Sequence, residues 1–199
     1  MNSWRLWRVV SLLLLGMSLS LWASHGWDTD GLRSVIRATA RTSLVLFSLA
    51  FSAGALFRLL PSEATRWLRR NRRYVGVSFA TSHVIHLIAL IALASVDQEL
   101  FWQLTNVANI VFAGAAYLVI AAMTATSFDR AAAWLGPRKW RLLHLVGSWY
   151  IWLVFAGAVG RRVPLGPIYW AMLALVVLAA VLRIVAMQSR GRRVAVAPS

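Results

Sequence analysis

Cysteine is absent from the sequence, and acidic residues are scarce. Without thiols the chain has no disulfide, no thiolate nucleophile and no iron–sulfur cluster, so any bound metal must be held by histidine or oxygen ligands. The six acidic residues all fall in loops or at the ends of apolar stretches: Asp28, Asp30, Glu63, Asp97, Glu99 and Asp129. No carboxylate is therefore expected inside a membrane for a proton relay or a cation site, which disfavours a pump or secondary transporter.

Apolar sequence is what the chain has in abundance. Of 199 residues, 60% are hydrophobic and only 14% are charged, which is too apolar for a water-soluble domain of this size. The pattern predicts an all-α polytopic membrane protein, a single domain over residues 1–199 with six transmembrane helices. The expected spans are residues 9–24, 43–60, 74–96, 104–126, 140–159 and 168–187. Each is close to the roughly 20 residues that cross about 30 Å of hydrocarbon.

The first apolar stretch could be either a signal peptide or a span. Residues 22–26 fit a small-residue cleavage site poorly, so we interpret the stretch as a retained helix.

The formal net charge of +15 comes from short arginine clusters between the spans, a topology signal of membrane proteins. No segment resembles a nucleic-acid-binding module, so the expected partner of this charge is membrane lipid. With both termini in the cytoplasm, only five of the 21 lysines and arginines fall outside: Arg33, Arg37, Arg41, Arg161 and Arg162. We therefore expect a multi-pass protein of a bacterial-type inner membrane with cytoplasmic termini.

Three histidines lie within the expected spans and are the candidate functional residues. His83 and His86 share one face of the third span, and His144 lies near the start of the fifth. At 1.5 Å per residue, His83 and His86 lie about 14 Å and 18 Å beyond Tyr74, whereas His144 lies about 9 Å beyond Arg138. Neutral imidazoles on two different helices are suited to ligate the iron of a haem b.

A second interpretation of these histidines needs no metal. Each could instead bond a hydroxyl or a backbone carbonyl of a neighbouring helix, and Ser78, Thr81 and Ser82 are close in sequence.

The sequence around the histidines resembles the ferric reductase-like transmembrane domain family. Arg72-Arg73-Tyr74-Val75-Gly76-Val77, with Ile85-His86-Leu87 ten positions after the glycine, is similar to the family's third-helix pattern. Thr124-Ala125-Thr126-Ser127, Leu135-Gly136 and Trp140-Arg141-Leu142-Leu143-His144-Leu145 are similar to the end of its fourth helix and the start of its fifth. The resemblance covers about residues 38–158. Within the family, the chain looks most like the small bacterial haem-binding membrane subunit of the periplasmic methionine sulfoxide reductase system.

The resemblance implies a haem b between the third and fifth helices that passes electrons across the membrane to a redox partner, ferric iron or another acceptor. His86 and His144 match the family's ligand positions. Two departures matter, because Gly157 and Arg72 stand where relatives carry further ligand histidines, thirteen positions after His144 and fourteen before His86. His83 is an additional histidine whose depth differs from that of His144 by only about 4 to 5 Å. We therefore expect one haem, bound by His144 and either His83 or His86.

The electron donor must be a separate molecule, since the chain has no nicotinamide or flavin domain and no glycine-rich phosphate loop. A partner protein, a quinone or a flavin at the cytoplasmic face could serve, and the basic segment Arg66–Arg73 could attract an anionic cofactor or partner besides setting topology. An enzymatic role would be that of an electron-transfer subunit of an oxidoreductase. The alternatives are a haem-free structural or assembly subunit, which the two missing ligands favour, and a small-molecule permease.

Overall fold

The computed structural model describes the backbone of residues 3–195 and the side chains of residues 4–189, and within this range all regular structure is helical. The long helices are α1 (Ser3–Ala23), α2 (Thr29–Leu59), α3 (Glu63–Val96), α5 (Val107–Ala125), α7 (Pro137–Gly160) and α8 (Pro167–Ala195). The connections contain short helical turns, α4 (Gln98–Leu104), α6 (Asp129–Leu135) and η1 (Val163–Leu165). Six of these helices are long and apolar enough to cross a membrane, which confirms the predicted number of spans.

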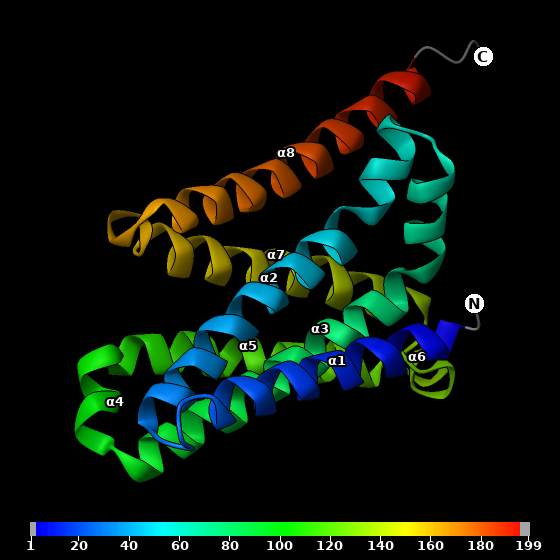
Figure 1. Cartoon of the computed structure of the whole chain (residues 1–199). Coiled ribbons are helices and arrows are strands. Elements are labelled where there is room, and N and C mark those ends of the chain that lie inside the picture. Colours follow the sequence, from blue (N-terminus) through cyan, green and yellow to red (C-terminus); the bar gives the residue numbers. More distant parts are fainter. Residues whose placement is uncertain (1–2, 196–199) are drawn as a thin grey trace.

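The long helices run roughly along one common direction, and α2 passes through the middle of the bundle (Figure 1). α2 packs mainly on α3 and α8, α1 covers α2 and α3, and α7 packs on α5 and α8. α3 and α7 are not among the pairs of helices whose backbones pack closely. The two helices that carry the candidate histidines therefore meet through their side chains, as where Phe79 and His83 of α3 pack on Phe155 of α7.

Two predicted connections turn out to be helical, which corrects the expected boundaries. α2 begins at Thr29 and α3 at Glu63, whereas the apolar pattern placed these helices at residues 43 and 74. Asp28 accepts a hydrogen bond from the Gly31 amide at 2.8 Å, and Ser62 forms a capping box at the start of α3. Because a polar segment outside the hydrocarbon can continue a capped helix, hydropathy locates the membrane crossing and not the helix end.

The remaining boundaries differ by smaller amounts and have local causes. Asn106 caps α5, so this helix begins at residue 107 instead of 104, and the preceding polar segment forms α4. The loop at residues 129–141 contains α6, although the predicted break at Gly136 is confirmed because its φ is +78° and Pro137 opens α7. α1 begins earlier than the predicted range of 9–24 and ends at Ala23, whereas α7 and α8 extend beyond 140–159 and 168–187 at both ends.

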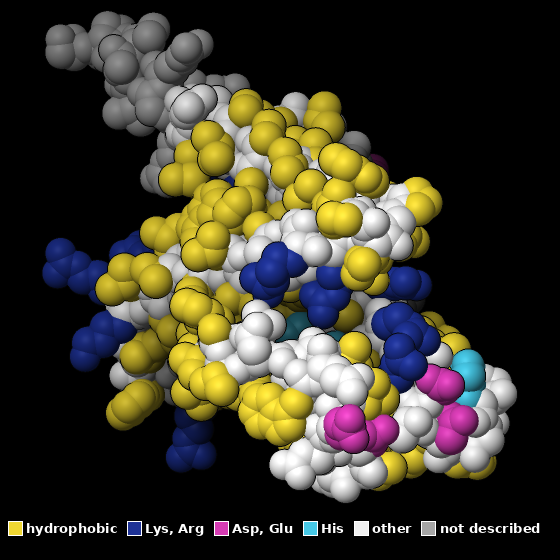
Figure 2. All heavy atoms as spheres, turned by 90° about the vertical axis from the view of Figure 1, so that its left-hand side faces the viewer, with side chains coloured by type: hydrophobic (Ala, Val, Ile, Leu, Met, Phe, Trp, Pro, Cys, Tyr) yellow, Lys and Arg dark blue, Asp and Glu magenta, His cyan; other side chains and the backbone are white. Residues whose placement is uncertain are grey.

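Aromatic packing forms the core between α2, α3 and α7. Phe47 and Phe51 of α2 pack with Phe79 of α3 and Ile151 of α7. Phe155 of α7, which is partly buried, packs against Phe47 at the edge of this cluster. Many other large apolar side chains are exposed, and Figure 2 shows them spread over the sides of the molecule. A surface of this kind is suited to contact with lipid.

Candidate functional site

His86 of α3 is held by hydrogen bonds to α2, which packs more extensively on α3 than any other helix does. Its Nδ1 atom lies 3.0 Å from Thr39 Oγ1 and 3.1 Å from the Ile36 carbonyl oxygen. Because a carbonyl can only accept, Nδ1 carries the proton and the lone pair of the neutral ring lies on Nε2. Nε2 forms no hydrogen bond with any residue that the structure describes and is not among the fully buried polar atoms. Histidines that bind metals are commonly oriented by a bond of this type.

Thr39 is built into the helix interface. It is completely buried, and its hydroxyl donates to the Val35 carbonyl at 2.6 Å, so its oxygen is free to accept from His86. One turn farther along, Ser82 of α3 bonds Thr42 and Ser43 of α2 at 3.0 and 2.9 Å. These hydroxyl contacts set the register of α3 against α2, and the register places His86 opposite Thr39.

His83 lies one turn before His86 in a pocket of aromatic rings. Its ring centroid is 5.0 Å from that of Phe79, 5.1 Å from Tyr117 and 5.7 Å from Phe155. The rings of His83 and His86 are stacked at 5.6 Å. His83 Nδ1 and the Tyr117 hydroxyl are both buried and have no partner among the described residues. Buried polar atoms without partners are unusual in a protein interior, and here two of them belong to side chains that are in contact, which suits a bound polar group.

His144 lies against α5 near the end of the bundle where α7 begins. Its ring stacks on Trp140 at 4.2 Å, and its Nε2 atom lies 3.1 Å from Thr126 Oγ1. The Thr126 hydroxyl donates to the Ala122 carbonyl at 2.8 Å, so it accepts from His144 Nε2 and leaves the lone pair on Nδ1. His144 and His86 thus each present one bare ring nitrogen, although a different one.

A cavity of about 570 Å³ lies beside His144, between α2, α3, α5, α7 and α8. A Cβ atom at either Gly54 or Gly76 in its wall would meet no other atom within 4 Å, so these glycines keep part of the space open. The remaining wall combines apolar side chains with four hydroxyl groups, the carboxylate of Asp129 and five arginines: Arg58, Arg72, Arg73, Arg141 and Arg183. This composition is suited to a ligand that has an apolar body and anionic groups.

The structure brings His83 and His86 together and leaves His144 apart from them. The cavity is lined by His144 but by neither helix α3 histidine, and Phe79 lines it while also packing on His83. The described residues contain no group of three or more His, Cys, Asp or Glu side chains that could hold a metal. A haem iron needs only axial ligands from the protein, so the predicted pairing of His144 with an α3 histidine stays a prediction.

The structure also shows what surrounds Gly157 and Arg72, the two positions where the chain departs from the family that it resembles. Arg161 Nη1 lies 3.6 Å from the position that a Cβ of Gly157 would take, and Arg161 Nη2 bonds Asn109 at 3.0 Å. An arginine thus covers the position of one missing ligand. At the other position Arg72 lines the cavity beside His144.

Two residues of the site were missed from the sequence. Thr39 lies in a stretch that was predicted to be a polar connection, so its contact with His86 could not be foreseen. Tyr117 could have been noticed as a hydroxyl in the middle of an apolar span. Its contact with His83 could not be predicted, because the sequence does not show how the two spans pack.

The six apolar helices and the apolar outer surface define the chain as a multi-pass helical membrane protein. Comparisons with protein-family models, with curated proteins and with solved structures gave no match to this chain. Likeness to the ferric reductase-like family therefore depends on the residues quoted above.

Proposed function

We propose that the chain is an integral membrane haem b protein that passes electrons across the bilayer to a redox partner or another acceptor. The observation that carries this proposal is the hydrogen bonding of His86. A histidine in the middle of an apolar span has its Nδ1 proton held by Thr39 and the Ile36 carbonyl, and its Nε2 lone pair is left without a partner among the described residues. A bound haem would supply reversible one-electron chemistry at this depth.

The other axial ligand must come from a different helix. His83 and His86 lie on the same face of α3 with stacked rings, so they cannot approach one iron from opposite sides. His144 is the candidate on α7, with His83 as the alternative to His86 on α3. Support for a ligand beside His144 comes from the cavity of about 570 Å³, whose wall includes Gly76 and Phe79 of α3 and Ile151 of α7. Neither His83 nor His86 lines this cavity, so binding of one haem by both helices requires Phe79, which packs on His83, to move.

The arginines of the cavity suit the anionic groups of a haem. Arg183 is half-buried, its guanidinium carbon lies 4.2 Å from the centre of the Phe51 ring, and it lines the cavity. An arginine within a membrane span is costly unless it is paired, and a haem carboxylate would pair with it.

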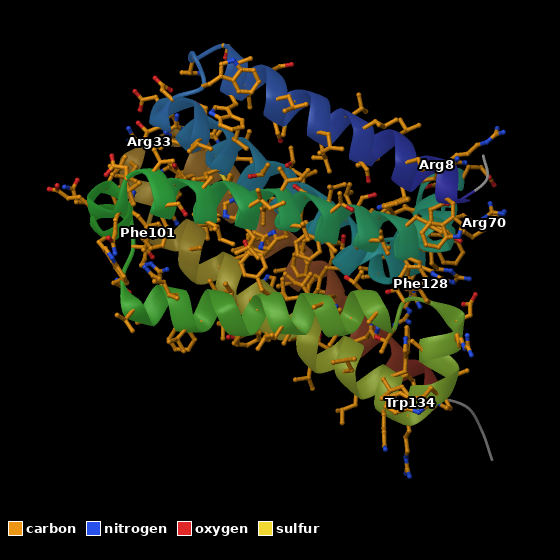
Figure 3. The ribbon with its side chains drawn as sticks, turned by 90° about the horizontal axis from the view of Figure 1, so that it is seen from below. Arg8, Arg33, Arg70, Phe101, Phe128 and Trp134 are labelled. Carbon is orange, nitrogen blue, oxygen red and sulfur yellow. The ribbon has the colours of Figure 1, made fainter. Side chains whose placement is uncertain are left out.

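We further propose a bacterial-type inner membrane location with both termini in the cytoplasm. Arg8 and Arg70 lie at one end of the bundle and Arg33 at the other (Figure 3). The first of these ends is the one where α1 begins and α8 ends (Figure 1). Since most lysines and arginines lie towards that end in the sequence pattern, the positive-inside rule favours the cytoplasm for it. Electrons would then enter from a partner protein, a quinone or a flavin at the cytoplasmic face.

The spectrum of the protein purified in detergent tests the proposal. We expect absorption bands of haem b and extractable haem in the wild type, and we expect His86→Ala to lose at least 90% of the bound haem, an order-of-magnitude loss. His25→Ala is the matched control, because His25 lies in the connection between α1 and α2, outside the spans, and should leave haem content unchanged. A wild-type protein without extractable haem would disprove the proposal, and unchanged haem in His86→Ala would disprove the ligand assignment.

A haem-free structural or assembly subunit is the second candidate. It is favoured by the protein partners that His86 and His144 already have, Thr39 and Thr126, and by the arginine that covers Gly157. A colourless wild-type protein that is nevertheless folded and stable would support this candidate.

A further inference from the structure

A second cavity, of about 500 Å³, lies where the end of α2 meets the first turns of α3. Its wall consists of Gly54, Phe57, Arg58, Arg69 and Arg72. A Cβ atom on Gly54 would meet nothing within 4 Å, so the glycine leaves the space open. Three guanidinium groups from two helices therefore border one cavity, and none of the carboxylates that the structure describes contributes to its wall.

Two of the three guanidiniums are held in place by the protein. Arg58 Nη1 donates to the backbone carbonyl of Ala186 on α8, at 2.6 Å. The guanidinium carbon of Arg69 lies 4.2 Å from the centre of the Phe57 ring, a cation–π contact. Positioned guanidiniums lose little further conformational entropy when they bind an anion.

The positive charge of this cavity has no counter-charge in the described part of the chain. The ion pairs there involve other arginines, namely Arg33, Arg66 and Arg73. The larger cavity shares Arg58 and Arg72 with this one, and its single acidic wall residue, Asp129, is bound to Arg73 at 2.8 Å. Like charges this close at a membrane boundary repel, and an anion bound between them would relieve the repulsion.

We propose that Arg58, Arg69 and Arg72 bind the phosphate of an anionic phospholipid. Phosphate oxygens accept paired hydrogen bonds from guanidinium groups, and basic pockets between transmembrane helices are suited to anionic headgroups. A lipid is favoured over a soluble phosphate because apolar surface adjoins the site. The α8 carbonyl that holds Arg58 lies in a stretch with exposed Ile184, Val185 and Met187, along which acyl chains can pack. The site shares Arg58 and Arg72 with the larger cavity, but Arg69 lines the smaller cavity alone, and the proposal requires no bound haem.

Native mass spectrometry of the full-length protein, titrated with phosphatidylglycerol, phosphatidylcholine or glycerol 3-phosphate, tests the proposal. We expect phosphatidylglycerol to bind at least about tenfold more tightly than either other probe, because only it combines apolar chains with a headgroup of net negative charge. Equal binding of the two lipids would overturn the site. Binding of glycerol 3-phosphate as tight as that of phosphatidylglycerol would overturn the lipid assignment.

The decisive comparison is between two neighbouring arginines. Arg69→Gln removes a charge from the cavity wall, whereas Arg70→Gln removes the same charge from the next residue, which lines neither cavity. We expect Arg69→Gln to weaken phosphatidylglycerol binding about tenfold and Arg70→Gln to change it by less than about twofold. Equal effects of the two variants would mean that only diffuse surface charge acts, and the proposed site would be wrong. Arg58→Lys, which keeps the charge but loses the planar group, should give an intermediate loss.

Discussion

At the scale of single residues, the position of the ring proton decides which nitrogen of each histidine is left for a ligand. His86 donates from Nδ1 to groups on α2, so its other ring nitrogen is available to a metal. His144 donates from Nε2 to Thr126, so its available nitrogen is Nδ1. The two candidate ligands would therefore bind a metal through different ring nitrogens. The sequence shows only that both are histidines within apolar spans.

Thr39→Val tests the role of the hydroxyl beside His86. Valine keeps the shape of threonine but cannot accept the imidazole proton, while the Ile36 carbonyl remains. We expect haem affinity to fall about tenfold, the lower end of the range for groups that orient metal-bound histidines. Titration of haem into the haem-free protein, followed by absorption, gives the affinity.

Thr42→Val is the control for this change. Thr42 has the same position on α2 one turn later, but it bonds Ser82 and no histidine. Both variants lose one hydroxyl at the α2–α3 interface, so equal losses of haem affinity would show that only packing is affected and would contradict the orienting role of Thr39.

At the scale of helices, close packing of α5 on α7 positions His144. A Cβ atom on Gly147 would lie 2.7 Å from Met123 Sδ and 2.8 Å from Val119 Cγ1, both on α5. Small residues at such crossings let membrane helices approach each other. His144 lies on α7 only three residues before this crossing, and its partner Thr126 follows Met123 at the end of α5.

Gly147→Ala should therefore destabilise the α5–α7 pair. We expect a loss of about 1 to 3 kcal/mol, because the added methyl group must displace side chains that are already in contact. Thermal unfolding in detergent measures the change. Gly114→Ala on α5 is the matched control, since a Cβ atom there meets nothing within 4 Å and alanine favours helix. A Gly147 variant as stable as the Gly114 variant would show that α5 and α7 do not pack as described.

At the scale of the whole molecule, the distribution of arginines gives the bundle two different ends. Five arginines, Arg33, Arg37, Arg41, Arg161 and Arg162, belong to the end that contains α4 and the turn between α7 and α8. Figure 2, which views this end, shows basic side chains gathered over a hollow. The opposite end carries the larger basic group and both described cavities with their arginines.

The absence of native cysteine makes the proposed orientation directly measurable. Single cysteines can replace Ser24, in the connection between α1 and α2, and Ala64, in the first turn of α3, both of which are exposed. With cytoplasmic termini, a membrane-impermeant thiol reagent should label Ser24→Cys in intact spheroplasts and Ala64→Cys only after lysis. The reverse pattern would invert the topology, and the cysteine-free wild type gives the background.

The amino-acid sequence by itself determined that this protein is a bundle of six membrane-spanning helices. Long apolar runs leave few alternatives, because a chain in hydrocarbon must satisfy its backbone hydrogen bonds within each helix. The helix ends were less well predicted, as the capped polar starts of α2 and α3 show, because hydropathy reports the membrane and not the helix.

Only the tertiary structure decided what surrounds the histidines. Thr39 and Ile36 are far from His86 in the chain, and their contact depends on how α2 is rotated and shifted against α3. The placing of Phe79 between His83, on which it packs, and the cavity that His144 lines depends equally on the relative depth of the helices. The rotation and depth of each helix are set by side-chain packing between helices that are distant in sequence. The periodicity of apolar residues along one helix carries no information about that packing.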